Sequence, residues 1–223
     1  MKNKIKKIDK KWWWPKDDGI SKNDGSETKQ SCWNYMLSQP DLPLLLSDHV
    51  ENKNVVVQAG GNCGFYVKQY AEIFQTVHTF EPDPVNFYCL NLNVTEENVF
   101  KIQACLGASR GTVGLDNYLP DVGATHVKGE GKVPVFLIDD LNLSACDLIH
   151  LDVEGFELFA LQGAKKTIEL FKPVICFEHH DGWSGRYQYG LNELENGKYD
   201  YPSSVTITPT YKNTTSESAI YHE

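Results

Sequence analysis

From residue 55 onward, short apolar runs alternate with segments whose apolar residues recur at helical spacing. The run VVVQA at 55–59 has the length of a buried strand, and Val67, Tyr70, Ala71 and Phe74 then give one apolar helix face. The same alternation continues along the chain. It predicts strands at 55–59, 77–81, 99–104, 112–116, 134–138, 147–152 and 173–178, and helices at 65–75, 84–93, 140–144 and 156–171.

This order favours an α/β fold, a Rossmann-like, doubly wound and mostly parallel sheet with helices on both faces. Near the end of the chain, the alternation VTITPTYKNT followed by SAIYH predicts a terminal β pair. Residues 117–132 are glycine-rich with few apolar positions, so they predict a long loop that could close over a substrate.

The first 45 residues are polar and predict an irregular N-terminal extension, which leaves 46–223 as the main domain. Within the extension, Trp12, Trp13 and Trp14 are too apolar to stay in water together. Two interpretations remain open. The rings pack against the main domain or a second subunit, which would suit a homodimer contact, or they form a lid or platform for a sugar or base.

Composition narrows the class of protein. A chain of 223 residues with 41% hydrophobic content can bury the core of one enzyme-sized domain. The net charge is −9, and the basic residues are concentrated in the first sixteen positions, so nucleic acid is an unexpected partner for the body.

Cysteine usage and hydropathy indicate a compartment. The six cysteines form no CxxC pair, which favours the reducing cytoplasm, or a host cytoplasm for a virus-encoded protein. No run approaches the roughly 18 apolar residues of a membrane span, and the basic start lacks the apolar core of a secretory signal. The sequence therefore predicts a soluble protein with no membrane partner.

The turn after the first strand points to a ligand. Gly60, Gly61 and Gly64 supply backbone freedom in GGNCG, although a plain structural turn could use them equally well. Glu81 then follows the second strand, 21 positions after Gly60, where an acid can accept hydrogen bonds from ribose hydroxyls. Strand, glycine turn, helix, strand and acid together predict an adenosine-binding unit.

A second group of polar residues follows the strand predicted at 147–152. In DLIHLDVEGFELFALQGA, Asp152 ends the strand and Glu154 precedes a helix. Ligands of open α/β sheets bind outside the carboxyl ends of the strands, so both should face the same crevice as the glycine turn. There they can hold a cation, take a proton or orient a hydroxyl. Alternatively, Glu154 caps the helix and Asp152 bonds only to backbone.

With both groups in view, the chain resembles the FkbM-type S-adenosylmethionine-dependent methyltransferases, which have the class I methyltransferase fold, and especially their short phage and viral versions. The resemblance covers residues 55–180. It is carried by QAGGNCG, FEPDPVNFYCLNLN, ACLG at 104–107, VPVFLIDDL at 133–141 and LDVEGFELFALQGA.

The resemblance implies S-adenosylmethionine as cofactor, with the glycine turn around its methionine part, the acid at its ribose and residues after the third strand at its adenine. Many members have an acid where this chain has Gln58, so the expected contact to the cofactor's amino group lacks a charge. The implied cofactor residues are Gln58, Gly60, Gly61, Asn62, Gly64, Glu81, Pro82, Cys105, Leu106 and Asp152.

The resemblance also implies O-methylation of a hydroxyl on a sugar, glycan or small metabolite, with Asp152 and Glu154 near the transferred methyl group. Asp152 is the first candidate for the base or hydroxyl-orienting group. His179 and His180 are second candidates, unless they are loop residues bonded to backbone. No HxxxH or HExxH spacing supports a divalent metal, although Asp152, Glu154 and a histidine could hold one.

Three other functions stay open. A nicotinamide-dependent oxidoreductase uses similar βαβ logic, but the strict GxGxxG is missing. A cap or base methyltransferase could use the basic, tryptophan-rich start to hold RNA. The acidic body and the lack of an Asn-Pro-Pro-aromatic or Asp-Pro-Pro-aromatic motif argue against this function. A non-catalytic relative would bind an adenosine ligand without turnover.

Overall fold

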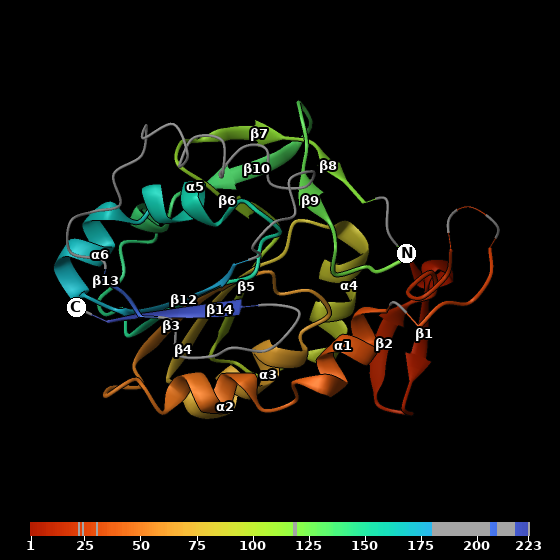
Figure 1. The fold of residues 1–223 in the computed structure, drawn as a ribbon, viewed down its shortest axis with the longest axis horizontal. Coiled ribbons are helices and arrows are strands. Elements are labelled where there is room, and N and C mark those ends of the chain that lie inside the picture. The colour runs from red at the N-terminus through yellow and green to blue at the C-terminus, as the bar shows by residue number, and fades with distance from the viewer. Residues whose placement is uncertain are drawn as a thin grey trace.

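A computed structural model describes residues 1–179, apart from 22, 24, 30, 118 and 119, together with 206–208 and 217–222. At its centre lies a seven-stranded sheet with the order β13-β14-β12-β11-β3-β4-β5 (Figure 1). Strand β14 runs antiparallel to β12, and β13 antiparallel to β14, which confirms the terminal β pair. The parallel strands are β3 (Val55–Ala59), β4 (Thr76–Phe80), β5 (Val99–Ile102), β11 (Leu148–Leu151) and β12 (Val174–His179), and the antiparallel ones are β13 (Thr206–Thr208) and β14 (Glu217–His222).

The strand order reverses next to β3. From β3 the chain continues outward to β4 and β5, and then returns to pair β11 with the other side of β3. Ala59, the last residue of β3, is in register with Phe80 on one side and Leu151 on the other. The segments that follow these three strands therefore meet at one edge of the sheet, where such folds place their ligands.

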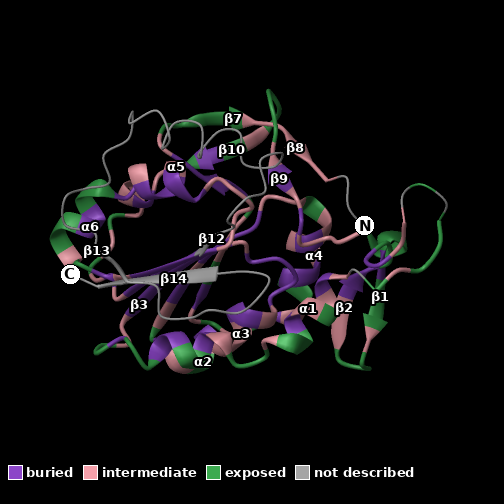
Figure 2. Ribbon diagram, in the orientation of Figure 1, coloured by how far each residue is buried: buried purple, intermediate pink, exposed green. Residues whose placement is uncertain are grey.

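Helices cover both faces of the sheet, as the doubly wound prediction requires. Figure 1 shows α2 and α3 below the sheet and α5 and α6 above it. The strands alternate accordingly, since Val56 belongs to the lower core and Val57 to the upper one. Buried residues concentrate on the strands and the inner helix faces (Figure 2). The helices are α1 (Cys32–Ser38), α2 (Leu42–Ser47), α3 (Phe65–Ile73), α4 (Pro84–Asn93), α5 (Glu157–Gln162) and α6 (Lys165–Phe171).

The strands predicted at 112–116 and 134–138 lie outside the central sheet. β10 (Val133–Phe136) pairs with β6 (Cys105–Leu106) and β7 (Gly111–Val113), and β8 (Leu115–Asp116) pairs with β9 (His126–Val127). Central parallel strands are buried on both faces, whereas β7 and β10 are largely exposed or half-buried. Period-two alternation identifies a strand but not the sheet that it joins.

Two predicted helices differ from the structure. In place of a helix at 140–144, the chain forms the 3-10 turn η2 (Ile138–Leu141), which Asn142 ends in the left-handed region with φ 49°. The helix predicted at 156–171 divides into α5 and α6 around Gly163. A Cβ at Gly163 would lie 2.1 Å from the carbonyl oxygen of Gly107, so this glycine lets two backbones touch and interrupts the helix.

The N-terminal extension folds onto the main domain. It contains η1 (Lys2–Lys4), a hairpin of β1 (Ile5–Ile8) and β2 (Trp12–Pro15), and helix α1, joined by irregular segments. Trp14 is 1% exposed, and the Trp12 ring lies 5.4 Å from that of Phe65 at the start of α3. The tryptophans therefore pack against the main domain, as one of the two interpretations expected. The boundary expected after residue 45 falls within α2 and stays a prediction.

Candidate functional site

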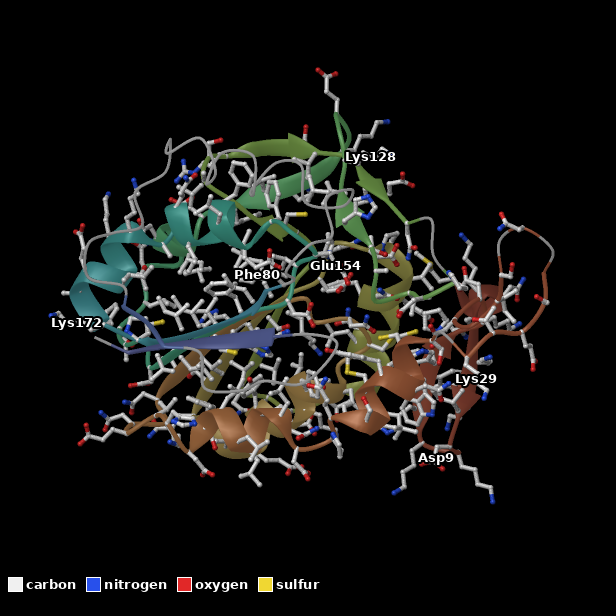
Figure 3. The ribbon with its side chains drawn as sticks, viewed as in Figure 1. Asp9, Lys29, Phe80, Lys128, Glu154 and Lys172 are labelled. Atoms are coloured by element: carbon white, nitrogen blue, oxygen red, sulfur yellow. The ribbon has the colours of Figure 1, made fainter. Side chains whose placement is uncertain are left out.

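A cavity of about 560 Å³ lies outside the carboxyl ends of the parallel strands, at the strand reversal. Its inner wall is formed by residues that follow or end β3, β4, β5 and β11. Figure 3 shows two of these lining residues, Phe80 and Glu154, near the middle of the molecule. The predicted site residues that line the cavity are Gly60, Asn62, Glu81, Pro82, Cys105, Leu106, Asp152 and Glu154.

The glycine turn is required by close contacts with the backbone of Asp152 and with side chains of the sheet and α4. Gly60 has φ +84°, and a Cβ there would lie 2.0 Å from the carbonyl oxygen of Asp152. Gly64 has φ +93°, and its Cβ would meet Val94 at 2.5 Å, while that of Gly61 would meet Thr79 at 2.6 Å. Gly60 therefore joins the two halves of the site, whereas Gly61 and Gly64 pack against the sheet and α4 rather than lining the cavity.

Gln58 supports this turn from beneath. Its side chain is 1% exposed and accepts a hydrogen bond from the Thr79 hydroxyl at 2.6 Å. Its amide Nε2 donates to the carbonyl oxygens of Gly60 at 2.9 Å and Ala59 at 3.2 Å. The amide thus fixes the end of β3, and the direct cofactor contact suggested for Gln58 stays a prediction.

Glu81 presents a buried carboxylate to the cavity. Its Oε2 accepts the backbone N–H of Asn62 at 2.7 Å, and its Oε1 accepts that of Asp83 at 2.8 Å. Burial raises the pKa of Glu81 to about 8, with the Asp83 charge acting in the same direction, while the backbone N–H groups of Asp83 and Asn62 and a hydrogen bond from the Asn86 side chain oppose it. A carboxylate has about four acceptor positions, so these donors leave Glu81 able to accept a hydrogen bond from a ligand hydroxyl.

The pKa of Glu81 predicts how the stability of the ligand-free protein depends on pH. An unfolded glutamate titrates near 4.5, so between about pH 4.5 and 8 only the unfolded chain has lost the proton. The free energy of unfolding should therefore fall as the pH rises through this window, by at most about 5 kcal/mol from this group. Urea denaturation from pH 5 to 8.5 measures it. Glu81→Gln should remove this component of the slope, and an unchanged slope would contradict the raised pKa.

Asp152 and Glu154 lie on a turn between β11 and α5. The Asp152 N–H donates to the carbonyl oxygen of Ala59 at 3.1 Å, and Glu154 has φ +55°. The Val153 N–H donates to Oε1 of Glu157 at 2.9 Å, so this buried glutamate holds the turn in place. The N-cap residue of α5 is Phe156, and the helix-capping alternative for Glu154 stays a prediction.

The outer wall of the cavity was not predicted from the sequence. It comes from the N-terminal extension and from the loop before β9, of which the sequence suggested only that it could close over a substrate. The tryptophan run predicted either packing on the domain or a lid for a ligand, and Trp12, Trp13 and Trp14 themselves do not line the cavity, whereas residues of the extension further along the chain do. The outer lining includes Lys29, Ser31, Cys32, Asn34, Tyr35, Met36 and Asp121 to Thr125.

His179 and His180 are the remaining predicted site residues, and a divalent metal is only an option that no motif supports. The backbone of His179 ends β12, and His180 lies outside the described residues, so the roles suggested for both stay predictions. In the part of the chain that is described, no three histidine, cysteine, aspartate or glutamate side chains are placed to share a metal ion. Within the same part, none of the helices has the length and apolar character that a membrane-spanning helix requires.

Comparison with known proteins agrees with this geometry. The model of the methyltransferase FkbM domain matches residues 54–201, about two thirds of the chain. A search of curated proteins found no match.

Solved structures share the fold. A methyltransferase FkbM from Methylobacillus flagellatus KT is 18% identical with a TM-score of 0.53, and the match covers 77% of this chain and 44% of that one. An rRNA methylase from Streptococcus thermophilus is 11% identical with a TM-score of 0.50, covering 82% and 93% of the two chains. The chain thus spans less than half of the FkbM structure, and identities this low establish the fold alone, which is the class I methyltransferase fold.

Proposed function

Since this chain belongs to the methyltransferase FkbM family, we propose that it transfers a methyl group from S-adenosylmethionine to a hydroxyl of a sugar, glycan or small metabolite. The observation that carries the proposal is the cavity at the strand reversal, which brings Gly60, Glu81 and Asp152 together. These residues come from three separate strand ends, so their convergence depends on the whole fold.

The inner wall fits the cofactor. The Glu81 carboxylate can accept a hydrogen bond from the ribose, and Cys105 and Leu106 offer an apolar surface for the adenine ring. Both of these residues are buried. Gly60 and Asp152 both line the cavity, so the methionine part can lie against the backbone of the glycine turn there.

The charges of the cavity support a cationic cofactor and a neutral acceptor. Of the described residues that line it, Lys29 is the single cation, whereas Glu81, Asp121, Asp152 and Glu154 are carboxylic acids. Such a lining attracts a sulfonium and an ammonium group and repels phosphates. The acceptor therefore fits a sugar or a small neutral metabolite better than a nucleic acid.

The cofactor would supply a methyl group made electrophilic by its positive sulfur. The enzyme then has to align the acceptor oxygen with the carbon–sulfur bond, because the reaction is an in-line displacement. Asp152 lies at the end of β11 beside the glycine turn, where its carboxylate can orient the acceptor hydroxyl and take its proton. The Val153 to Glu157 hydrogen bond keeps this turn in position.

Cofactor binding should depend on pH through Glu81. Ribose hydroxyls donate to the ionised carboxylate, whereas burial keeps the free protein largely protonated below its pKa of about 8. Binding should then release close to one proton at pH 7, and the affinity should be about tenfold weaker at pH 7 than at pH 9. Isothermal titration with S-adenosylhomocysteine in two buffers of different ionisation enthalpy measures both quantities.

Glu81→Gln is the matched control for this titration. The variant has no carboxyl to ionise at position 81, whereas the amino group of the ligand titrates in the same way for both proteins. The ratio of the native affinity to the variant affinity at each pH therefore isolates the contribution of Glu81. The ratio should change about tenfold between pH 7 and pH 9. A ratio independent of pH would remove the ribose role from Glu81, and no binding by the native protein at any pH would overturn the proposed function.

The acceptor is tested by transfer of a deuterated methyl group. The protein is incubated with methyl-labelled S-adenosylmethionine and separate pools of monosaccharides, glycans, small hydroxylated metabolites and capped or uncapped RNA, and the products are identified by mass spectrometry. A mass increase on a hydroxyl of a sugar, glycan or metabolite is expected. Labelled RNA alone would replace this acceptor class by nucleic acid, and cofactor binding without transfer would favour a non-catalytic relative.

A further inference from the structure

Asp18 binds donors from three separate segments of the chain. The residue is 8% exposed, and its Oδ2 accepts the indole N–H of Trp14 at 2.8 Å and the backbone N–H of Trp33 at 3.1 Å. Its Oδ1 accepts the backbone N–H of Cys32 at 2.9 Å and that of Val122 at 3.3 Å. One buried carboxylate therefore joins β2, the start of α1 and the loop before β9.

These hydrogen bonds depend on each other. A buried carboxylate is tolerated when donors satisfy its lone pairs, and hydrogen bonds to a charged acceptor are stronger than those between neutral groups. Conversely, the N–H groups of Cys32 and Trp33 begin a helix and have no partner within it. Loss of the carboxylate would leave buried donors from all three segments without an acceptor.

The loop before β9 is held from its other side as well. The carbonyl oxygen of Val122 accepts the Nδ2 amide of Asn86 on α4 at 3.0 Å. At Gly123 the loop touches α1, because a Cβ there would lie 3.1 Å from the sulfur of Cys32. The Gly19 N–H also donates to the carbonyl oxygen of Pro120 at 2.6 Å. The loop is thus fixed between the N-terminal extension and α4.

Two of the three segments that Asp18 joins, the start of α1 and the loop before β9, face the cavity. Cys32 and Val122 line it, together with the hydroxyl, amide and carboxyl side chains of Ser31, Asn34 and Asp121. The inner wall opposite already accounts for ribose, adenine and methionine in the proposed function. The N-terminal part of the outer wall precedes residue 54, where the family match begins, so it belongs to this chain's own extension.

We propose that Asp18 is a positioning residue that clamps α1 to the loop at 120–125, and that these two segments form the acceptor-facing wall of the cavity. The assignment of this wall to the methyl acceptor rests on the proposed function. The clamp itself depends only on the hydrogen bonds of Asp18. The N-terminal extension is therefore part of the active site rather than an anchor beside it.

Hydrogen–deuterium exchange of the full chain tests two claims: that Asp18 couples the two segments, and that the wall they form faces the acceptor rather than the cofactor. In Asp18→Asn, amides at 31–36 and 121–125 should both exchange at least tenfold faster, while those of the glycine turn at 60–64 keep their native rate. Asp17→Asn is the matched control, because this neighbouring carboxylate is exposed, and it should exchange like the native protein. Saturating S-adenosylhomocysteine should slow exchange at 60–64 and leave the two wall segments unchanged.

Each other outcome overturns a definite part of the inference. Faster exchange in one wall segment alone would show that Asp18 does not couple them, and slowing of the wall by S-adenosylhomocysteine would assign the wall to the cofactor. If Asp18→Asn does not fold, Trp14→Phe removes only one donor and should speed both segments about threefold, with native rates counting against the clamp. If S-adenosylhomocysteine does not bind the native protein, the proposed function fails while the exchange of the variants still judges the clamp.

Discussion

Alanine at position 60 should abolish cofactor binding. The new Cβ would lie 2.0 Å from the carbonyl oxygen of Asp152, so the two strand ends that form the site would have to separate. The residue would also be held at φ +84°, in the left-handed region. Overpacking and backbone strain together should lower the free energy of unfolding by roughly 2–5 kcal/mol, and the affinity for S-adenosylhomocysteine should fall more than about a hundredfold.

Gly129→Ala is the matched control for this variant. Gly129 has φ +63°, but a Cβ there would meet nothing within 4 Å, so the change brings the left-handed strain without the contact. It should cost roughly 1–2 kcal/mol of stability and leave cofactor affinity within about twofold of native. Urea denaturation and isothermal titration of both variants separate the two effects. Equal losses in the two variants would show that strain, and not the approach of Asp152, is the reason for glycine at position 60.

The inner half of the site could be predicted from the sequence because its determinants are local. A strand followed directly by Gly60 and Gly64 requires a tight turn, and the strand that ends before Glu81 places an acid beside that turn. The predicted helix at 84–93 coincides with α4, because Asp83 caps it and Pro84 opens it. Each of these signals lies within a few positions of the feature that it determines.

The outer half could not be predicted, because it depends on contacts between distant residues. The hydrogen bond from Val122 to Asp18 joins positions 104 apart, and no periodicity records such a pair. The same applies to the interruption of the predicted helix at 156–171, which arises where Gly163 meets the backbone of Gly107. The role of Glu157 was missed for a different reason, since its apolar helical context favoured a place on α5 and hid its bond to the preceding turn.

Asp152→Asn should lower kcat by roughly 10²–10⁴-fold, the range that general acid–base catalysis contributes. Asparagine keeps the shape of the side chain but cannot take a proton from the acceptor hydroxyl. The contacts of residue 152 with Ala59 and Gly60 are made by its backbone, so the substitution should leave them in place. The side chain also faces the cofactor, and the affinity for S-adenosylhomocysteine should therefore change, but stay within about tenfold of native. Initial rates with the identified acceptor, together with isothermal titration, measure the two quantities.

Glu154→Gln is the control for this prediction, because Glu154 lies on the same turn, lines the same cavity and carries the same charge. If Asp152 is the base, the Glu154 variant should keep more than about a tenth of the native kcat and the native dependence of kcat on pH. The Asp152 variant should lose the increase in kcat with pH that follows deprotonation of the base. Equal losses in both variants would mean that the cavity needs negative charge near the sulfonium rather than a base at one position. A nearly native kcat for Asp152→Asn would move the proton acceptor to another group, with His179 and His180 the next to be substituted, since β12 ends at the same edge of the sheet as β11.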